Sequence, residues 1–348
     1  MTEQTYMQLA VNAAKKASGR TWTNPLVGAV LVKDDQVLAI GYHHRFGLQH
    51  AEVDALSRLT DSTSAAGSTL YVTLEPCSHY GKQPPCVEKI VQAGIKRVVI
   101  GQLDPNPLVA GRGIEYLKQH HVQIELLDQS FGLNEAYNFY YQHHRPQITI
   151  KYAMTLDGKI NHQEGQRSLV TGPVAYQDAQ NLRAQHQAIL IGHHTLTVDD
   201  PLMTVRTKKL AYPPVRIILM HDSASFDLNQ RLLTNDGPIW LLCQHHSRTD
   251  LPENVTAFVA ANWTPAKISQ FLAQQQIQSL LVEGGSQVQA EFVSAGLVDK
   301  LVTYIAPKIY GGRGLPTVLG PALNQESTFE ITTTQLLDTD LRIEARRK

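Results

Sequence analysis

The sequence lacks the marks of a secreted, membrane-spanning or nucleic-acid-binding protein. It holds 3 cysteines in 348 residues, too few for a disulfide framework, so we expect a reducing, cytoplasmic compartment. Lys plus Arg and Asp plus Glu both number 31, and no basic run breaks this balance, which argues against nucleic acid as a partner. The first residues contain no continuous apolar stretch of the secretory kind. No segment approaches the roughly 18 apolar residues that cross a bilayer, so we expect no membrane contact.

What is present is the patterning of layered α/β structure. In the first half, the i, i+3, i+4 spacing of apolar residues predicts a helix over 6–17, and two short apolar runs at 26–32 and 37–42 predict a hairpin. Helices and strands then alternate, with helices predicted at 51–59, 86–93 and 114–119 and strands at 69–75, 97–101 and 122–127. This alternation is typical of a layered α/β domain.

A polar, basic seam at 143–146, closed by Pro146, predicts the boundary between two domains, residues 1–145 and 146–348. Beyond the seam the pattern restarts. Buried strands are predicted at 148–153, 188–191, 215–220, 239–243, 280–282 and 301–306, helices at 174–187, at 268–275 and from about 287, and a closing antiparallel pair at 329–333 and 341–345. We therefore expect the second domain to be another α/β layer structure.

The residues that carry chemistry are His50, Glu52, Cys77 and Cys86. A hydrolytic zinc site uses three protein ligands and leaves one position for water, whereas a structural site closes with four. The histidine and the two cysteines supply three ligands, each expected where a helix begins and where the positive helix end favours thiolate over thiol. Glu52, two residues after the histidine, can lie beside the metal and move protons from the attacking water to a leaving amine.

Each of these signals has a plainer interpretation when it is taken alone. A single His-x-Glu is usually a surface or core feature, and a buried cysteine is often a small hydrophobe, which is how we interpret Cys243 in a predicted strand. His79 offers a fourth ligand, which would make the site structural. In combination and in this order, however, the residues match the zinc-deaminase signature of His-x-Glu, Pro-Cys and a second Cys.

Longer segments carry a resemblance to a known family. They are Asn24–Val30, His50–Glu52, Thr73–Gly81, Pro84–Cys86, Asp104–Pro107 and Ala110–Gly113. Together they closely resemble the bifunctional deaminase/reductases of riboflavin biosynthesis, and the eight residues between the two cysteines are that family's own spacing. The resemblance covers essentially the whole chain.

For the first half, the resemblance implies a cytidine-deaminase-like α/β/α layer fold and the zinc-dependent hydrolytic deamination of 2,5-diamino-6-(5-phosphoribosylamino)pyrimidin-4(3H)-one. The implied substrate contacts are Asn24, His43, Lys82, Asp104 and Asn106. Asn and Asp side chains can read the donors and acceptors of a heterocycle, and a lysine is a suitable point charge for the ribosyl phosphate. Alone, the Asp-Pro-Asn-Pro stretch would be interpreted as a turn and the lysine as a solvated loop charge.

For the second half, the resemblance implies a dihydrofolate-reductase-like α/β domain that uses NADPH to reduce 5-amino-6-(5-phosphoribosylamino)uracil to the ribityl product. A glycine pair after a predicted strand would let backbone N–H groups approach a pyrophosphate. The implied cofactor contacts are Ala153, Leu169, Thr195, Asp199, Gly284 and Gly285, and the implied substrate contacts are Lys151, Arg167, Arg183, Met203, Arg206 and Glu283. The two arginines at 183 and 206 suit a phosphate, although the first alone would equally fit a surface charge.

The second half departs from the family pattern at several positions. Leu169 stands where a tryptophan is usual, Arg167 where a small hydroxyl residue is usual, and His193 and His194 where small residues are usual. Our hypothesis is that reduction still occurs, with altered cofactor affinity. The alternatives are a deaminase with an impaired or unrelated second domain, a deaminase of another base, and a zinc-stabilised binding protein without catalysis. The resemblance also implies a homodimer or homotetramer that acts on small phosphoribosylated pyrimidines.

Overall fold

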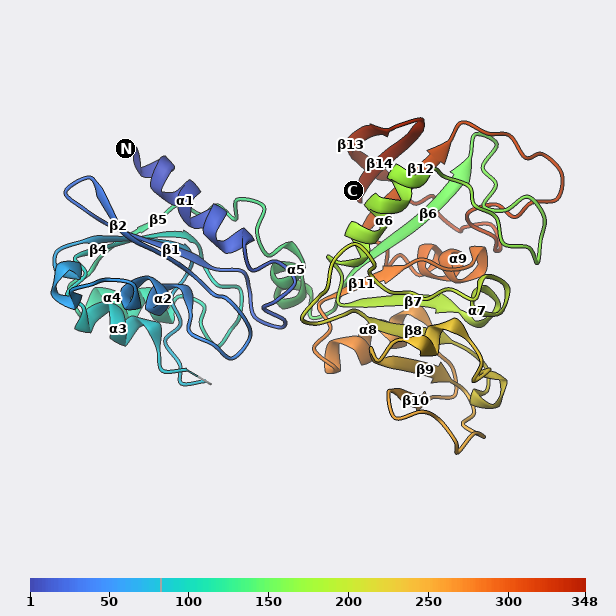
Figure 1. Ribbon diagram of the computed structural model, residues 1–348, viewed down its shortest axis with the longest axis horizontal. Coiled ribbons are helices and arrows are strands. Elements are labelled where there is room, and N and C mark those ends of the chain that lie inside the picture. The colour runs from blue at the N-terminus through green and yellow to red at the C-terminus, as the bar shows by residue number, and fades with distance from the viewer. Residues whose placement is uncertain (82) are drawn as a thin grey trace. The chain divides into compact units, whose positions relative to one another are not determined.

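Two sheets organise the chain, one of five strands and one of nine, in the computed structural model of residues 1–81 and 83–348 (Figure 1). They lie in two units, which we call the first unit, Met1–His144, and the second unit, Arg145–Lys348. No described helix is long and apolar enough to cross a membrane.

The first unit is a sheet with helices on both faces. Its elements are α1 (Glu3–Lys15), β1 (Gly28–Lys33), β2 (Gln36–Tyr42), α2 (Ala51–Ser57), η1 (Ser62–Ala65), β3 (Thr69–Leu74), α3 (Cys86–Gln92), β4 (Arg97–Gln102), α4 (Arg112–Gln119), β5 (Gln123–Leu126) and α5 (Glu135–His143). The strand order is β2-β1-β3-β4-β5. β1 pairs antiparallel with β2 and β3, whereas β3, β4 and β5 are parallel.

Alternate residues of the strands face opposite layers of helices. Val30 and Val32 of β1 pack with Tyr6 and Met7 of α1, whereas Leu31 of the same strand packs in the cluster that includes residues of α2, α3 and α4. Figure 1 shows α1 on one side of this sheet and α2, α3 and α4 on the other. The expected α/β/α layer fold is confirmed.

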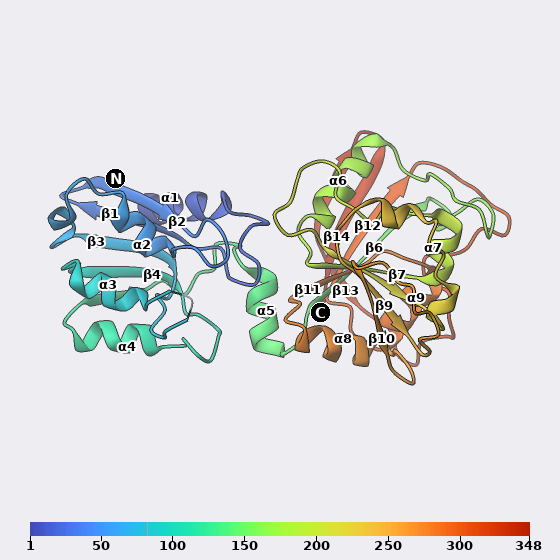
Figure 2. The ribbon, with the colours of Figure 1, turned by 60° about the horizontal axis from the view of Figure 1, so that its bottom comes forward.

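The second unit is built on a mostly parallel sheet. Its elements are β6 (Gln147–Thr155), α6 (Pro173–Arg183), β7 (Ala188–Gly192), α7 (His193–Asp199), β8 (Val215–Leu219), η2 (Ser223–Ser225), η3 (Arg231–Thr234), β9 (Ile239–Cys243), β10 (Val255–Val259), α8 (Pro265–Gln274), β11 (Ser279–Val282), α9 (Ser286–Ser294), β12 (Lys300–Ala306), β13 (Phe329–Leu337) and β14 (Asp340–Arg347). The strand order is β10-β9-β8-β7-β11-β6-β12-β14-β13. Strands from β10 to β12 in this order are parallel, and β14 and β13 add the predicted antiparallel pair at one edge (Figure 2).

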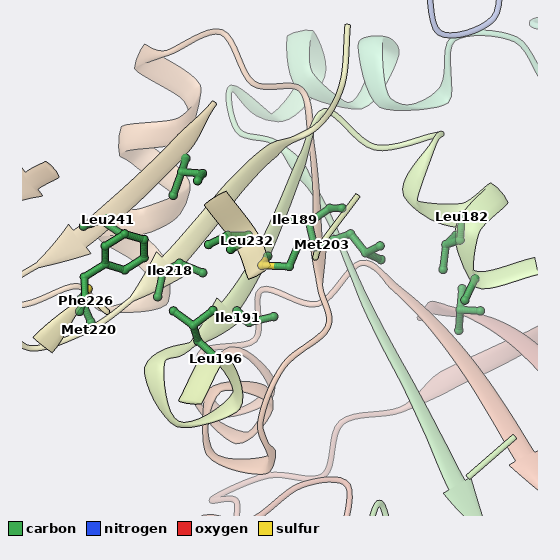
Figure 3. Packing of buried hydrophobic residues seen from close by; sticks show 14 of the residues in the cluster. Leu182, Ile189, Ile191, Leu196, Met203, Ile218, Met220, Phe226, Leu232 and Leu241 are labelled. Carbon is green, nitrogen blue, oxygen red and sulfur yellow. The ribbon is translucent and has the colours of Figure 1, made fainter. Parts of the chain in front are cut away.

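The sheet of the second unit is covered on both faces, as parallel sheets are. On one face α6, α7, β7, β8 and β9 contribute a large apolar cluster, of which Figure 3 labels Leu182, Ile189, Ile191, Leu196, Met203, Ile218, Met220, Phe226, Leu232 and Leu241. The alternate residues Leu190, Leu280 and Val282 point to the other face and are also buried. Cys243 belongs to the labelled cluster and is fully buried, so its predicted core position is confirmed.

Six elements, three of them the short 3₁₀ helices η1, η2 and η3, were not predicted from the apolar pattern, and some predicted elements run past the observed ends. The helices α5 and α7 and the strand β10 are present where no element was expected. The helix predicted to reach residue 187 ends at Arg183. At the seam, α5 continues to His143 and stops because His144 adopts a left-handed conformation with φ of 54°.

One buried carboxylate joins three parts of the first unit. Glu75, directly after β3, is 3% exposed and accepts backbone N–H groups of Gly111 at 2.9 Å, Gly113 at 2.9 Å, Ile114 at 3.2 Å and Asp104 at 3.4 Å. A negative charge at the start of α4 also suits the positive end of that helix. Gly113 is required here, because a Cβ atom at this position would lie 2.2 Å from the carbonyl oxygen of Pro76.

Replacing Glu75 by glutamine should loosen this part of the fold. An amide offers one acceptor oxygen and turns an NH₂ group toward backbone donors, so we expect a loss of about 2–4 kcal/mol in local stability. The measurement is hydrogen exchange of residues 104–114, which should become much faster in Glu75→Gln. Glu115→Gln, an exposed position of α4, is the control and should leave exchange unchanged. Equal protection in both variants would contradict the role given to Glu75.

Candidate active site

A cavity of about 280 Å³ opens in the first unit where β3 and β4 end. Parallel strands bring their carboxyl ends to one edge of a sheet, so the segments that follow them meet there. The loop before β1, the loop after β2 and the helices α2 and α5 complete the wall. Among the lining residues are Asn24, His43, Phe46, His50, Glu52, Glu75, Cys77, His79, Asp104, Asn106, Val109, Tyr137 and Tyr141.

Three predicted metal ligands come together beside this cavity, which His50 and Cys77 line and behind which Cys86 is buried. The Nδ1 atom of His50 lies 3.4 Å from Sγ of Cys77 and 3.3 Å from Sγ of Cys86, and the three ligand atoms all lie within 4.8 Å of one another. Tetrahedral zinc with a Zn–N bond of about 2.0 Å and a Zn–S bond of about 2.3 Å places N and S about 3.5 Å apart. The group therefore fits a zinc ion.

The ligands are held by local backbone structure. His50 is the extended N-cap of α2 and Cys86 is the first residue of α3. The expectation that all three begin helices is wrong for Cys77, which lies in the loop after β3. Its sulfur nevertheless faces the start of α3, because the Cys86 backbone N–H donates to it at 3.4 Å.

The surroundings favour one thiolate in this pair. A hydrogen bond with Cys86 lowers the pKa of the Cys77 thiol, and the same hydrogen bond, followed by burial, raises the pKa of Cys86. These directions favour retention of the proton at Cys86. A divalent cation bound by both sulfurs would displace that proton, as metal binding to thiols does.

Glu52 has the properties of a proton carrier. It is the second residue of α2, is 3% exposed and lines the cavity. Burial, followed by the charge of Cys77, raises the pKa of its carboxyl to about 7. Among the described residues, its Oε2 atom has no hydrogen-bond partner, although such buried atoms are normally paired. This free oxygen is available to a bound water or substrate.

The ligand group has three members rather than four. His79 lines the cavity, but in the described part of the chain neither it nor another His, Cys, Asp or Glu joins the three ligand atoms. A site with three protein ligands is of the open, hydrolytic kind, which disfavours a purely structural zinc site.

Four of the five predicted substrate residues line the same cavity: Asn24, His43, Asp104 and Asn106. The fifth, Lys82, lies outside the described residues. The Asn24 side-chain amide lies 3.2 Å from Nε2 of His43, whose Nδ1 lies 2.9 Å from the Gln49 carbonyl oxygen. Burial lowers the pKa of His43, so a neutral ring with Nδ1 donating satisfies both contacts. The sequence interpretation missed Tyr137 and Tyr141, although their i, i+4 spacing was a usable sign of one helix face.

In the second unit, three predicted substrate residues form a buried ionic cluster. Arg183 of α6 donates two hydrogen bonds to Glu283, at 2.7 and 2.6 Å, and Nζ of Lys151 lies 3.8 Å from the same carboxylate. Although burial opposes it, Arg183 and then Lys151 lower the pKa of Glu283 to about 2. Burial lowers the pKa of Lys151. The surface-charge interpretation of Arg183 is therefore wrong.

Several predicted cofactor residues lie at or beyond the carboxyl ends of the parallel strands β6, β7 and β11. β7 and β11 are parallel neighbours, which brings Thr195 of α7 close to the glycine pair after β11. Gly285 has φ of 67°, and a Cβ atom there would lie 3.1 Å from Oγ1 of Thr195. A Cβ atom at Gly284 would lie 2.6 Å from Ile191. Ala153, in β6, pairs with Tyr304 of β12.

The other predicted residues of the second unit differ in their surroundings. Burial raises the pKa of Asp199, against the opposing charge of Arg167. Nε of Arg206 donates to the Tyr176 hydroxyl at 2.9 Å. Met203 is 1% exposed and packs in the apolar cluster, so its side chain contacts core residues, whereas Leu169 is 74% exposed.

Comparisons with known proteins assign both halves. Residues 1–102 match the cytidine and deoxycytidylate deaminase zinc-binding region, and residues 146–343 match the RibD C-terminal domain. The second match overturns the alternative of an unrelated second domain. Residues 103–145 belong to neither match.

Relatives and solved structures match nearly the full length. The riboflavin biosynthesis protein RibD of Aquifex aeolicus is 38% identical over 89% of this chain and 88% of its own, and that of Escherichia coli is 36% identical over 92% of each. A structure of Acinetobacter baumannii RibD has a TM-score of 0.91 with 33% identity, covering 99% of this chain and 98% of the other. The chain belongs to the RibD family of riboflavin biosynthesis proteins.

Proposed function

We propose that residues 1–145 deaminate 2,5-diamino-6-(5-phosphoribosylamino)pyrimidin-4(3H)-one and that residues 146–348 reduce the resulting 5-amino-6-(5-phosphoribosylamino)uracil with NADPH. This proposal is supported above all by one observation: Glu52, whose Oε2 atom has no hydrogen-bond partner among the described residues, lines the same cavity as His50 and Cys77, which form the ligand group with the buried Cys86. A related Thermotoga maritima structure, with a TM-score of 0.89 and 32% identity over 99% of this chain and 98% of that chain, bears the name of a deaminase and reductase for these two compounds.

The deaminase step depends on proton transfer by Glu52. When bound by His50, Cys77 and Cys86, zinc supplies a Lewis acid that lowers the pKa of water. As the water oxygen bonds to the ring carbon, Glu52 takes its proton, and the carboxyl then passes the proton to the amine as the C–N bond breaks and ammonia leaves. Burial raises the pKa of this carboxyl, which favours both acceptance and release of a proton by the same group. Asn24, His43, Asp104 and Asn106 hold the substrate, together with Lys82.

The reductase step needs placement of a hydride donor and a sugar. NADPH carries the hydride chemistry. The turn at Gly284 and Gly285 would hold its pyrophosphate, since this backbone has no side chains to block the approach, and Ala153, Leu169, Thr195 and Asp199 would complete the cofactor contacts. Lys151 would lie close to the reacting sugar. Arg206 suits the phosphate, whereas Arg183 is already bound to Glu283 and would fix that carboxylate toward the substrate; Arg167 and Met203 are the remaining substrate contacts.

The setting of the protein follows from the same family. We infer a cytoplasmic enzyme with small phosphoribosylated pyrimidines as its substrates, assembled as a homodimer or homotetramer. The balance of 31 basic and 31 acidic residues argues against nucleic acid as a binding partner.

The first test is ammonia release by zinc-loaded protein supplied with the diaminopyrimidine ribotide. Glu52→Gln should lower the rate about 10²- to 10⁴-fold, the usual contribution of a general acid–base group, while zinc content stays at one ion per chain because the ligands are untouched. Glu52→Gln should make no substrate for the reductase, but NADPH oxidation by this variant should be restored when the deaminated product is supplied. Ammonia release that survives this substitution would contradict the assignment of Glu52.

A second test separates the reductase. Lys151→Met should slow NADPH oxidation with the deaminated substrate about tenfold or more, the effect of losing a charged contact, with ammonia release unchanged. The variant should still fold, because the buried Glu283 carboxylate retains its two hydrogen bonds from Arg183. Lys267→Met, at an exposed position of α8, is the matched control. No NADPH oxidation by the unaltered chain would show that the departures at Leu169, His193 and His194 have cost it this activity.

A further inference from the structure

The helix α5 is fixed against the deaminase cavity by two reciprocal amide pairs. Asn134, just before the helix, accepts the Leu26 N–H at 2.7 Å and donates to the Leu26 carbonyl oxygen at 2.8 Å. Asn138, one turn into the helix, exchanges two hydrogen bonds with Gln102 at the end of β4, at 3.0 and 3.2 Å. Each pair satisfies donor and acceptor together, so the position of α5 relative to the cavity is well defined.

This placement brings the Tyr137 hydroxyl to a substrate-pocket carboxylate. Tyr137 lies between Asn134 and Asn138 in the chain and is 6% exposed. Its hydroxyl donates to Oδ1 of Asp104 at 2.9 Å, and Asp104 is itself 6% exposed. Burial and the neighbouring carboxylate raise the pKa of Tyr137, so the hydroxyl remains a donor.

The two oxygens of Asp104 have different tasks. Oδ1 accepts from the Tyr137 hydroxyl and also from the Asn106 backbone N–H at 2.9 Å. The hydrogen bonds from described residues to the Asp104 side chain all go to Oδ1, and none goes to Oδ2. Asp104 nevertheless lines the cavity. With one oxygen held by two donors, the carboxylate plane is set and the second oxygen is left for a ligand.

We propose that Tyr137 is a positioning residue of the deaminase: its hydroxyl fixes the Asp104 carboxylate so that Oδ2 accepts a hydrogen bond from a donor group of the aminopyrimidine substrate. This inference rests on the proposed function. Tyr137 lies in the stretch 103–145, which neither family match covers.

The proposal has an electrostatic consequence. Burial raises the pKa of Asp104 to about 6, and the hydrogen bonds from Asn106 and Tyr137 oppose that rise. The charged or titratable groups around it are Glu75 and Cys77, which raise its pKa, and the two α5 tyrosines at 137 and 141. Removing the Tyr137 hydroxyl should raise this pKa further. The carboxylate accepts a hydrogen bond from the substrate only in its ionised form, which is present above the pKa. When this pKa rises, the loss of substrate binding on acidification should therefore begin at a higher pH.

The experiment measures substrate affinity without turnover, in the zinc-loaded full chain carrying Glu52→Gln. The dissociation constant of the diaminopyrimidine ribotide is followed by calorimetry across mildly acidic to neutral pH. Adding Tyr137→Phe should weaken binding about five- to tenfold near neutrality, as the loss of one hydrogen bond to a charged group would, and should move the acidic loss of binding to higher pH. Tyr140→Phe, on the same helix but outside the cavity lining, is the matched control and should do neither.

A double-mutant cycle separates positioning from general destabilisation. With Asp104→Asn already present, Tyr137→Phe should change the affinity no further. Unchanged affinity and an unchanged pH profile in Tyr137→Phe would overturn the inference, as would an equal loss with and without the Asp104 carboxylate. If the Glu52→Gln parent itself fails to bind the ribotide, the proposed function is contradicted and the inference falls with it.

Discussion

The deaminase pocket depends on one buried negative charge, the carboxylate of Glu75. Four backbone N–H groups converge on it, and only an ionised carboxylate has enough acceptor sites for them all. The charged hydrogen bonds offset the cost of removing the carboxylate from water. Because Glu75 lies two residues before Cys77, the same group connects a metal ligand to the loop that carries Asp104 and Asn106 and to the start of α4.

In both units, parallel strands bring residues that are far apart in the sequence to one edge of a sheet. Parallel strands end at one edge, and short loops or helix starts after them meet there. In the first unit this edge unites the metal ligands with the pocket side chains. In the second it unites Thr195 with Gly285, while Lys151, Arg183 and Glu283 pair inside the domain. There, a lysine and an arginine neutralise one carboxylate, so the buried charge is paired rather than isolated.

Patterns within a few residues were readable from the sequence, and contacts across long separations were not. Strands buried on both faces give continuous apolar runs, so most of the sheet in each unit could be predicted. The edge strand β10 is partly exposed and α7 has seven residues, so neither carries a clear period. The face of α5 is built from Asn and Tyr rather than aliphatic residues, so the apolar periodicity did not reveal this helix. The pairing of Arg183 with Glu283, 100 residues apart, could not be read from local sequence.

The position of α5 bears on how the two activities can be separated. The zinc-binding-region match ends at residue 102, and a fragment cut there would contain His50, Glu52, Cys77 and Cys86. It would nevertheless lose the loop that Glu75 binds and the tyrosine wall of the cavity, because both come later in the chain. A fragment that keeps the whole cavity wall therefore has to extend through α5 to His143, well beyond the end of the metal-binding motif.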